Sequence, residues 1–287
     1  MSIDTPSGVY CIRTMTRDDI DTAIEWAARE GWNPGRDDAA CFHAADAEGF
    51  LVGVRDGEIV ATISVVRYDT KFGFLGLYFV KPEFRGRGYG MQLWQAGLAR
   101  LANRTVGLDG VIAQQDNYRK SGFTLAYRNI RYEGTADSRG VVNRRIVPIS
   151  SLPFDTVADY DRLAFPAERA KFLRCWILQP RGNAFGFVRD GVLVGYGVIR
   201  PARNGFKIGP LFADDAGVAE ALFDAMTTRI APDSTLCLDV PEVNPAAIAL
   251  AERGGMSVVF ETARMYSGAM PDISLQRVYG VTTFELG

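Results

Sequence analysis

Strand-like and helix-like spacings of apolar residues follow one another through the first half of the chain. Residues 50–55, 58–67 and 72–80 have the apolar, β-branched and aromatic character of strands. Met91, Trp94, Leu98 and Leu101 recur at the spacing of one helix face. The alternation predicts an α/β fold with a mixed sheet. The predicted strands are 9–13, 50–55, 58–67, 72–80, one ending at Leu108, and 123–132; the predicted helices are 17–31, 37–44, one after Gly90, and 114–121.

Local signals indicate where several of these elements begin and end. Thr16 and Asp19 stand three residues apart before an apolar run, which is the pattern of a capping box at the start of a helix. The dipeptide Asp56-Gly57 lies between two strand-like runs and is a strong signal for a two-residue hairpin turn. We therefore expect strands 50–55 and 58–67 to be antiparallel neighbours.

The second half of the chain repeats the first. Val54-Arg-Asp-Gly57 recurs as Val188-Arg-Asp-Gly191, and Gly122 after a short helix recurs as Gly255, at offsets of about 133 to 134 residues. Chance recurrence of a hairpin and a helix is the alternative, but the order of strands and helices between these anchors also matches. A chain of 287 residues has room for two domains of ordinary size. We predict an internal duplication, with residues 1–135 as the first domain, 136–150 as a linker and strand, and 151–287 as the second domain.

Composition and charge exclude several classes of protein. Hydrophobic residues make up 47% of the chain, which is ordinary for a globular protein. The formal net charge is -2, so the molecule as a whole has no long-range attraction for nucleic acid or anionic lipid. The chain also lacks an apolar run long enough to span a membrane and a signal-peptide pattern. We expect a cytoplasmic protein with neither nucleic acid nor membrane as partner.

Cysteine and histidine usage narrows the chemistry further. The four cysteines, Cys11, Cys41, Cys175 and Cys237, stand singly and far apart, so we expect reduced thiols in the core. One histidine, His43, rules out a centre with several histidine ligands and leaves little support for a Ser-His-Asp hydrolase. No metal site is predicted.

A glycine-rich and arginine-rich turn carries the clearest chemical signal. The segment Arg85-Gly-Arg-Gly88-Tyr-Gly90 stands between a predicted strand and an amphipathic helix. Backbone amides at a helix amino end can hold a pyrophosphate, and the two arginines add charge-assisted hydrogen bonds. The P-loop and dinucleotide-binding spacings do not match this segment. The alternative interpretation is a glycine-rich turn with solvated arginines.

The segment Val80-Lys-Pro-Glu-Phe-Arg-Gly-Arg-Gly-Tyr-Gly90 resembles motif A of the GNAT (GCN5-related N-acetyltransferase) superfamily. The resemblance implies that acetyl-CoA is the cofactor. It also implies that Phe79 and Val80 pair with the pantetheine arm, and that an amide of the same strand stabilises the oxyanion. The loop residues that would bind the pyrophosphate are Arg85, Gly86, Arg87, Gly88, Tyr89 and Gly90.

A second segment agrees with this family. Tyr118-Arg-Lys-Ser-Gly122-Phe123 is similar to the short helix whose tyrosine protonates the leaving thiolate in many relatives, so the resemblance implies that Tyr118 is the general acid. A phenol of pKa about 10 is protonated at neutral pH and can donate to a thiolate of pKa about 8.5 in the transition state. A tyrosine that only packs under the cofactor is the alternative. Val111 stands where many relatives have an asparagine, which leaves the pantetheine contacts at that position uncertain.

The second half resembles a GNAT domain that has lost its cofactor motif. Residues 212–224 contain no arginine and one glycine, together with four acidic residues that would repel a pyrophosphate. Ala251 stands where the tyrosine would fall, although Asn244 occupies the place of the asparagine. We therefore predict one acyl-CoA site and one degenerate domain. The tandem layout is similar to that of the YitH-type acetyltransferases.

The sequence identifies the residues of the acceptor side less clearly. Asp109 and Asp37 are predicted to stand on loops and are candidates for the general base and for acceptor binding, although an Asp-Gly turn and a helix N-cap are equally ordinary roles. Trp32 and Asn33 are predicted to contact the acceptor, with a core role as the alternative for Trp32. The second domain could cover the acceptor cleft, with Trp176, Tyr266 and Tyr279 as lining groups.

The resemblance implies an N-acetyltransferase in which an amine attacks the thioester directly in a ternary complex. We expect a small-molecule amine as acceptor. A protein lysine acetyltransferase and a non-catalytic acyl-CoA sensor remain alternatives, and the oligomeric state is open.

Overall fold

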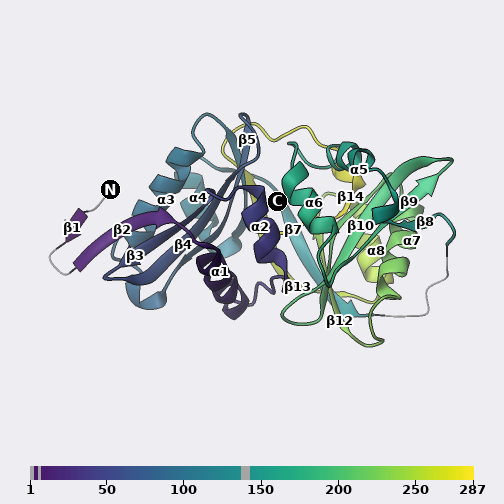
Figure 1. Ribbon diagram of the computed structural model, residues 1–287, viewed down its shortest axis with the longest axis horizontal. Helices are drawn as coiled ribbons and strands as arrows, with labels where there is room; N and C mark the ends of the chain where they lie inside the picture. Colours follow the sequence, from purple (N-terminus) through teal and green to yellow (C-terminus); the bar gives the residue numbers. More distant parts are fainter. Residues whose placement is uncertain (1–2, 6–7, 137–142) are drawn as a thin grey trace.

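The computed structural model describes residues 3–5, 8–136 and 143–287. Within these residues the strands form one 14-stranded mixed sheet, in the order β1-β2-β3-β4-β5-β6-β13-β7-β12-β11-β10-β9-β8, with β14 paired to β11 (Figure 1). We call residues up to 135 the first half and residues from 146 the second half. Part of the predicted linker, residues 137–142, lies outside the described residues.

The predicted mixed α/β fold is confirmed. The first half contains β1 (Ile3–Thr5), β2 (Gly8–Thr14), α1 (Arg17–Arg29), α2 (Asp38–Ala45), β3 (Phe50–Arg55), β4 (Glu58–Arg67), β5 (Phe72–Val80), α3 (Tyr89–Arg100), β6 (Thr105–Val111), α4 (Gln115–Lys120) and β7 (Thr124–Thr135). The second half contains β8 (Ile146–Pro148), α5 (Phe154–Asp161), α6 (Ala170–Ile177), β9 (Asn183–Arg189), β10 (Val192–Pro201), β11 (Phe206–Ala213), α7 (Ala216–Thr227), β12 (Thr235–Pro241), α8 (Pro245–Arg253), β13 (Ser257–Tyr266) and β14 (Val278–Gly280).

The predicted local signals form the expected structures. Thr16 and Asp19 make both hydrogen bonds of a capping box at the start of α1. The turn between β3 and β4 has positive φ at Asp56 and Gly57, and the turn between β9 and β10 repeats this at Asp190 and Gly191. Positive φ at both central residues matches the twist of the flanking strands, so each turn sets an antiparallel hairpin.

The two halves exchange strands at the centre of the sheet. β13 of the second half lies between β6 and β7 of the first half, and β7 lies between β13 and β12. In the β7–β13 ladder Asn129 faces Thr262, and these positions are 133 residues apart, which is the offset of the duplication. An approximate two-fold axis therefore passes between them, and each half completes the sheet of the other.

Two buried ion pairs related by this axis hold the exchanged strands. Asp239 on β12 binds Arg131 on β7 through both carboxylate oxygens, at 2.6 and 2.8 Å. Asp109 on β6 binds Arg264 on β13 in the same way, at 2.9 and 2.6 Å. Each pair joins directly facing residues of neighbouring strands, one from each half. A carboxylate and a guanidinium that both leave water need this bidentate geometry to offset the loss of hydration.

The apolar core divides between the two faces of the sheet. Helices α3 and α4 cover one face over the first half with Leu93, Trp94 and Tyr118, and α7 and α8 cover the second half on their own cluster. The largest cluster joins the halves, because it contains residues from α1, α2, α5 and α6 together with Val278, Val281, Phe284 and Leu286. The C-terminal residues are thus part of the core between the halves. None of the helices in the described residues is long and apolar enough to cross a membrane.

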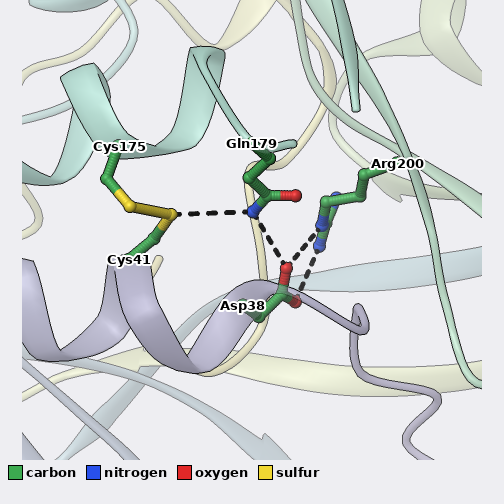
Figure 2. Close-up of a disulfide and its surroundings, with 5 residues drawn as sticks. All are labelled: Asp38, Cys41, Cys175, Gln179 and Arg200. Carbon is green, nitrogen blue, oxygen red and sulfur yellow. Dashed lines mark hydrogen bonds and ion pairs between the residues drawn. A yellow bond between two sulfur atoms is a disulfide. The ribbon is translucent and has the colours of Figure 1, made fainter. Parts of the chain in front are cut away.

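The expectation that all four cysteines are reduced is wrong for two of them. Cys41 on α2 and Cys175 on α6 form a disulfide (Figure 2). Cys11 and Cys237 are free. The two residues are 134 positions apart, so they are equivalent positions of the duplicated halves. The axis that relates the halves brings α2 against α6, so the two cysteines meet without a local spacing such as CxxC. Their separation by the duplication offset was the signal that could have predicted the bond.

Polar contacts next to the disulfide join the same two helices to β10. The side-chain amide nitrogen of Gln179 donates to Oδ1 of Asp38 at 3.2 Å and lies 3.8 Å from Sγ of Cys41 (Figure 2). Asp38 also accepts from Arg200 at 2.9 Å, and both of these side chains are fully buried. The covalent bond and the ion pair therefore fasten the first half to the second at one place.

Loss of the disulfide should lower the stability of the whole molecule. The bond links residues 134 apart, so it restricts a large part of the unfolded chain. We expect the double variant Cys41→Ser/Cys175→Ser to lose about 2–4 kcal/mol of unfolding free energy in urea denaturation followed by circular dichroism. Cys11→Ser serves as the control, since Cys11 is an unpaired, half-buried thiol. Equal unfolding midpoints for the double variant and the wild type would contradict a stabilising role.

Candidate active site

A glycine-rich turn joins β5 to α3 at one end of the sheet. Gly86 and Gly88 have φ of 73° and 83°, and a Cβ added at either position would meet nothing within 4 Å. Backbone conformation, not space, therefore favours glycine at both positions. Gly88 is the N-cap of α3, and no side chain in the described part of the chain caps that helix end. The first amides of α3 are left as hydrogen-bond donors for an anion.

Two exposed arginines flank this turn. Nε of Arg85 donates to the carbonyl oxygen of Val80 at 2.9 Å, and the guanidinium lies 5.5 Å from the ring centre of Phe79. The guanidinium of Arg87 lies 5.8 Å from the ring centre of Phe84. Ring contacts of this kind hold the arginine stems without neutralising their charge. Glu30 lies 3.8 Å from Arg85, but both side chains are exposed, so water screens this pair. The turn is therefore electropositive.

The strand that leads into this turn has an open edge. β5 pairs with β6 only from Phe72 to Leu75. At Leu77 the backbone takes a φ of 44°, and the register against β4 shifts. Phe79 and Val80 keep their partners in β4, but no strand of the described residues pairs with them on the side of β6. An extended ligand rich in amides could hydrogen-bond along this edge.

The remaining two predicted loop residues pack inward. The side chain of Tyr89 is buried against Tyr10, with ring centres 4.7 Å apart, so only its backbone can face the turn. A Cβ at Gly90 would lie 2.6 Å from the hydroxyl oxygen of Tyr78 and 2.7 Å from Val80. Gly90 therefore allows α3 to approach β5 closely.

Tyr118 lies on α4 beside the point where β5 and β6 separate. Its ring stacks on Trp94 at 5.7 Å, and a Cβ at Gly110 of β6 would overlap the ring. Burial, reinforced by the neighbouring phenol of Tyr78, raises the pKa of Tyr118 to about 12. The phenol is thus fully protonated at neutral pH. Tyr78 was missed in the sequence, although its place in the same strand, just before Phe79, was a usable signal.

The predicted loop position of Asp109 is wrong. β6 continues to Val111, so Asp109 lies inside the strand and is not in an Asp-Gly turn. Both oxygens of its carboxylate bind Arg264, and the side-chain amide of Asn129 donates to Oδ1 at 2.8 Å. The strand was predicted to end at Leu108, which is too early, because the dipeptide Asp109-Gly110 resembles a turn. The tertiary partner, Arg264, lies 155 residues away and donates to both oxygens of the buried carboxylate.

Two of the predicted acceptor residues, Asn33 and Asp37, bind residues of the second half, and Trp32 binds the exchanged strand β7. Asn33 exchanges two hydrogen bonds with the backbone of Asn204, at 2.9 and 2.8 Å. Asp37 is at the N-cap position of α2, but its side chain caps nothing and instead binds Arg181 at 2.7 Å. The carbonyl oxygen of Trp32 accepts from Arg131 at 2.7 Å. The structure therefore brings these residues to the junction of the halves. The predicted lining groups Trp176, Tyr266 and Tyr279 are all buried in the core.

The equivalent turn in the second half is closed to an anion. Asp215 is the N-cap of α7, and its Oδ1 accepts from the amide of Val218 at 2.9 Å. Its other oxygen binds Arg189 at 2.9 Å. A carboxylate therefore occupies the amides that the uncapped α3 offers in the first half.

Comparison with known proteins identifies a family for each half of the chain. Residues 17–123 match the model of the Acetyltransferase (GNAT) family, and residues 157–280 match that of an Acetyltransferase (GNAT) domain. The holothin acyltransferase of Pseudoalteromonas sp. (strain SANK 73390) is 30% identical over 263 residues, covering 92% of this chain and 90% of that protein.

Solved structures show the same fold. A Pyrococcus horikoshii protein assigned as an acetyltransferase has a TM-score of 0.83 at 24% identity, covering 99% of this chain and 98% of its own. A tandem GNAT protein from the clavulanic acid biosynthesis pathway has a TM-score of 0.63 at 15% identity, covering 91% and 99%. The chain therefore belongs to the GNAT superfamily of acyltransferases, as a tandem member with one GNAT domain in each half.

Proposed function

We propose that this enzyme transfers an acetyl group from acetyl-CoA to a primary amine of a small-molecule acceptor. The observation that carries the proposal is the meeting of three features at one end of β5. These features are the uncapped amino end of α3, the open strand edge at Phe79 and Val80, and the buried phenol of Tyr118. In the second half, Asp215 caps the corresponding helix and Ala251 stands in place of the tyrosine.

The residues of the first half fit the parts of acetyl-CoA in order. Amides of residues 86–90 with Arg85 and Arg87 would hold the pyrophosphate, and the edge of β5 would bind the pantetheine arm. The thioester would then reach the point near Leu77 where β5 leaves β6, and a β5 amide would bind the oxyanion. Val111 offers no side-chain hydrogen bond there, so backbone contacts would bind the arm.

The reaction we propose needs no covalent enzyme intermediate. The amine nitrogen attacks the thioester carbon, the new C–N bond forms and the C–S bond breaks. Tyr118 gives its proton to the departing thiolate, the proton on the attacking nitrogen leaves to water, and the Tyr118 phenolate takes a proton back from water. Binding both substrates in one complex supplies much of the rate through proximity. Asp109 is already held by two guanidinium nitrogens of Arg264, which favours a role in positioning β13 over the role of base.

The division of the chain follows from the same proposal. Residues 1–135 form the acyl-CoA domain, 136–150 the linker and strand, and 151–287 the degenerate domain. Because β7 and β13 are exchanged, neither part contains a complete sheet by itself. The second half supports the acceptor side through its contacts with Asn33 and Asp37.

The acceptor can be tested directly. Release of the CoA thiol should be followed with wild-type enzyme, acetyl-CoA and a panel of small amines, together with holothin, the acceptor in the name of the curated relative. A lysine-containing peptide belongs in the same panel. Turnover with a small amine and not with the peptide supports the proposal. The reverse result would indicate a protein lysine acetyltransferase, and binding of acetyl-CoA without turnover on any acceptor would indicate a sensor.

The cofactor loop gives a prediction that is independent of the acceptor. Arg85→Ala/Gly88→Ala should raise the Kd of acetyl-CoA by about 10- to 100-fold in calorimetry, because it removes a charged donor and strains the turn that presents the amides. Gly57→Ala is the matched control, since Gly57 also has positive φ and open space but lies in the β3–β4 hairpin. Unchanged affinity in the double variant would contradict the assignment of the loop.

A further inference from the structure

The end of the chain enters the sheet of the second half where two strands separate. β11 pairs with β12 only from Phe206 to Ile208. Beyond this point β14 pairs with β11, with Val278 facing Phe212 and Gly280 facing Leu211. On its other side the amide of Val281 donates to the carbonyl oxygen of Asp239 on β12 at 2.8 Å. The segment thus fills the space between β11 and β12.

This space corresponds to the open edge of β5 in the first half. β5 leaves β6 after Leu75, just as β11 leaves β12 after Ile208, 133 residues later. At the same offset, Phe79 corresponds to Phe212, which is paired with Val278. The edge that is open in one half is covered by the chain itself in the other.

Asn244 binds this segment with its side-chain amide. Its Nδ2 lies within hydrogen-bond distance of the carbonyl oxygens of Leu275, Gln276 and Val278, at 3.3, 3.1 and 3.0 Å. Its Oδ1 accepts from the amide of Ala247 and caps α8. One buried asparagine therefore joins the segment to the start of a helix. The equivalent position of the first half is Val111, whose side chain cannot make such bonds.

From β14 the chain continues to the first half. The carbonyl oxygens of Val281 and Thr282 lie against Gly209, where a Cβ would approach within 2.5 and 2.6 Å. The carbonyl oxygen of Glu285 lies against Gly76, the equivalent glycine of β5, where a Cβ would approach within 2.1 Å. Two glycines without side chains let the segment cross both strands. Gly76 directly precedes Leu77, where β5 parts from β6.

Contacts with residues of both halves hold the far end of the segment. The hydroxyl of Tyr68 donates to the carbonyl oxygen of Leu286 at 2.8 Å, and Arg169 donates to Oγ1 of Thr282 at 2.9 Å. Phe284 is buried with the guanidinium of Arg131 4.9 Å from its ring centre. The segment therefore lies under the strand that we assign to the thioester.

We propose that residues 275–286 are an intramolecular ligand of the second half. Residues 275–281 occupy the edge that acyl-CoA would take there, and this docking holds residues 282–286 beneath β5 of the first half, where they form the floor of the acceptor site. The second half thus contributes to acceptor selection and binds no acyl-CoA. The inference rests on the proposed function for the assignment of the acceptor side, whereas the docking itself can be measured without a known acceptor.

The test variant removes the side-chain amide donor of Asn244 and keeps the oxygen that caps α8. Asn244→Asp still accepts from the amide of Ala247, but a carboxylate cannot donate to three carbonyl groups and repels them. We expect faster hydrogen exchange at the amides of residues 278–281 and a rise of about tenfold or more in the KM of the acceptor. The Kd of acetyl-CoA should stay within about twofold, because the cofactor loop is unchanged. Asn183→Ala, at the exposed start of β9, is the control and should match the wild type.

A second variant and the stoichiometry keep the test decisive. Asn244→Ser also retains a capping oxygen, but it lacks the amide donor and adds no charge. It takes the place of Asn244→Asp in the test if that variant does not fold. Calorimetry of the wild type should give one acetyl-CoA per chain. Two bound molecules per chain would overturn the inference, as would unchanged hydrogen exchange and unchanged KM in a folded variant. A wild type that binds no acetyl-CoA, with the exchange changes still present, would count against the proposed function alone.

Discussion

Tyr118→Phe should lower kcat for acyl transfer by about 10²- to 10⁴-fold, the usual contribution of a positioned general acid. The phenylalanine ring keeps the stack on Trp94 and the contact over Gly110, so only the proton donor is lost. Neither the Kd of acetyl-CoA nor the unfolding free energy should change by more than a small amount. The measurement is steady-state release of CoA thiol with an acceptor found in the panel, together with calorimetry.

The matched control for this variant is Tyr132→Phe, which removes a phenol in the core of the second half. Its kcat should equal that of the wild type. Because the pKa of Tyr118 is raised to about 12, the phenol stays protonated across the neutral range and loses its proton only as the pH nears that value. The wild-type rate should therefore show no fall around neutral pH from this group. A kcat in Tyr118→Phe equal to the wild type would exclude proton donation by Tyr118.

Asp239→Ala should destabilise the molecule by about 3–5 kcal/mol, because it leaves buried cations without their counter-ion. Arg131 and Asp239 are each about 2% exposed, and Lys207 lies 3.5 Å from the same carboxylate. Burial alone would raise the pKa of Asp239, but the charges of Arg131 and Lys207 outweigh it and lower the pKa. Its contribution to stability is therefore present above the unfolded pKa of about 3.9 and is lost as the pH falls through the lower folded value.

The control for this prediction is another Arg–Asp pair between the halves. Asp37 and Arg181 also make two hydrogen bonds, but Arg181 is 52% exposed. Asp37→Ala should cost much less than Asp239→Ala, because water screens the pair. Both variants are compared with the wild type by urea denaturation at neutral pH. Equal losses for the two would show that burial does not set the strength of these pairs.

How well the sequence predicted each residue of the candidate site depends on how close its partners lie along the chain. The turn of residues 85–90 was predictable, because glycines at positive φ before a helix carry their chemistry within a few residues. Asp109 was misplaced because its partner, Arg264, lies 155 residues away and turns an apparent Asp-Gly turn into the middle of a strand. Asn33 and Asp37 were predicted to bind the acceptor, which stays a prediction, and nothing in the sequence indicated that their partners, Asn204 and Arg181, are both in the other half.

By itself the sequence determined most elements of the first half, the duplication, the family and the half that carries the cofactor motif. The spacing of apolar residues, the capping box and the turn dipeptides each involve residues within about ten positions of one another. They can therefore be recognised in the sequence without knowledge of the fold. Only the tertiary structure decided the exchange of β7 and β13, the Cys41–Cys175 bond, the buried Arg–Asp pairs and the docking of residues 275–286. These contacts join residues that are distant in the chain, and nothing near either partner specifies the other. They form because two similar halves pack about an approximate two-fold axis, which brings equivalent and exchanged positions face to face.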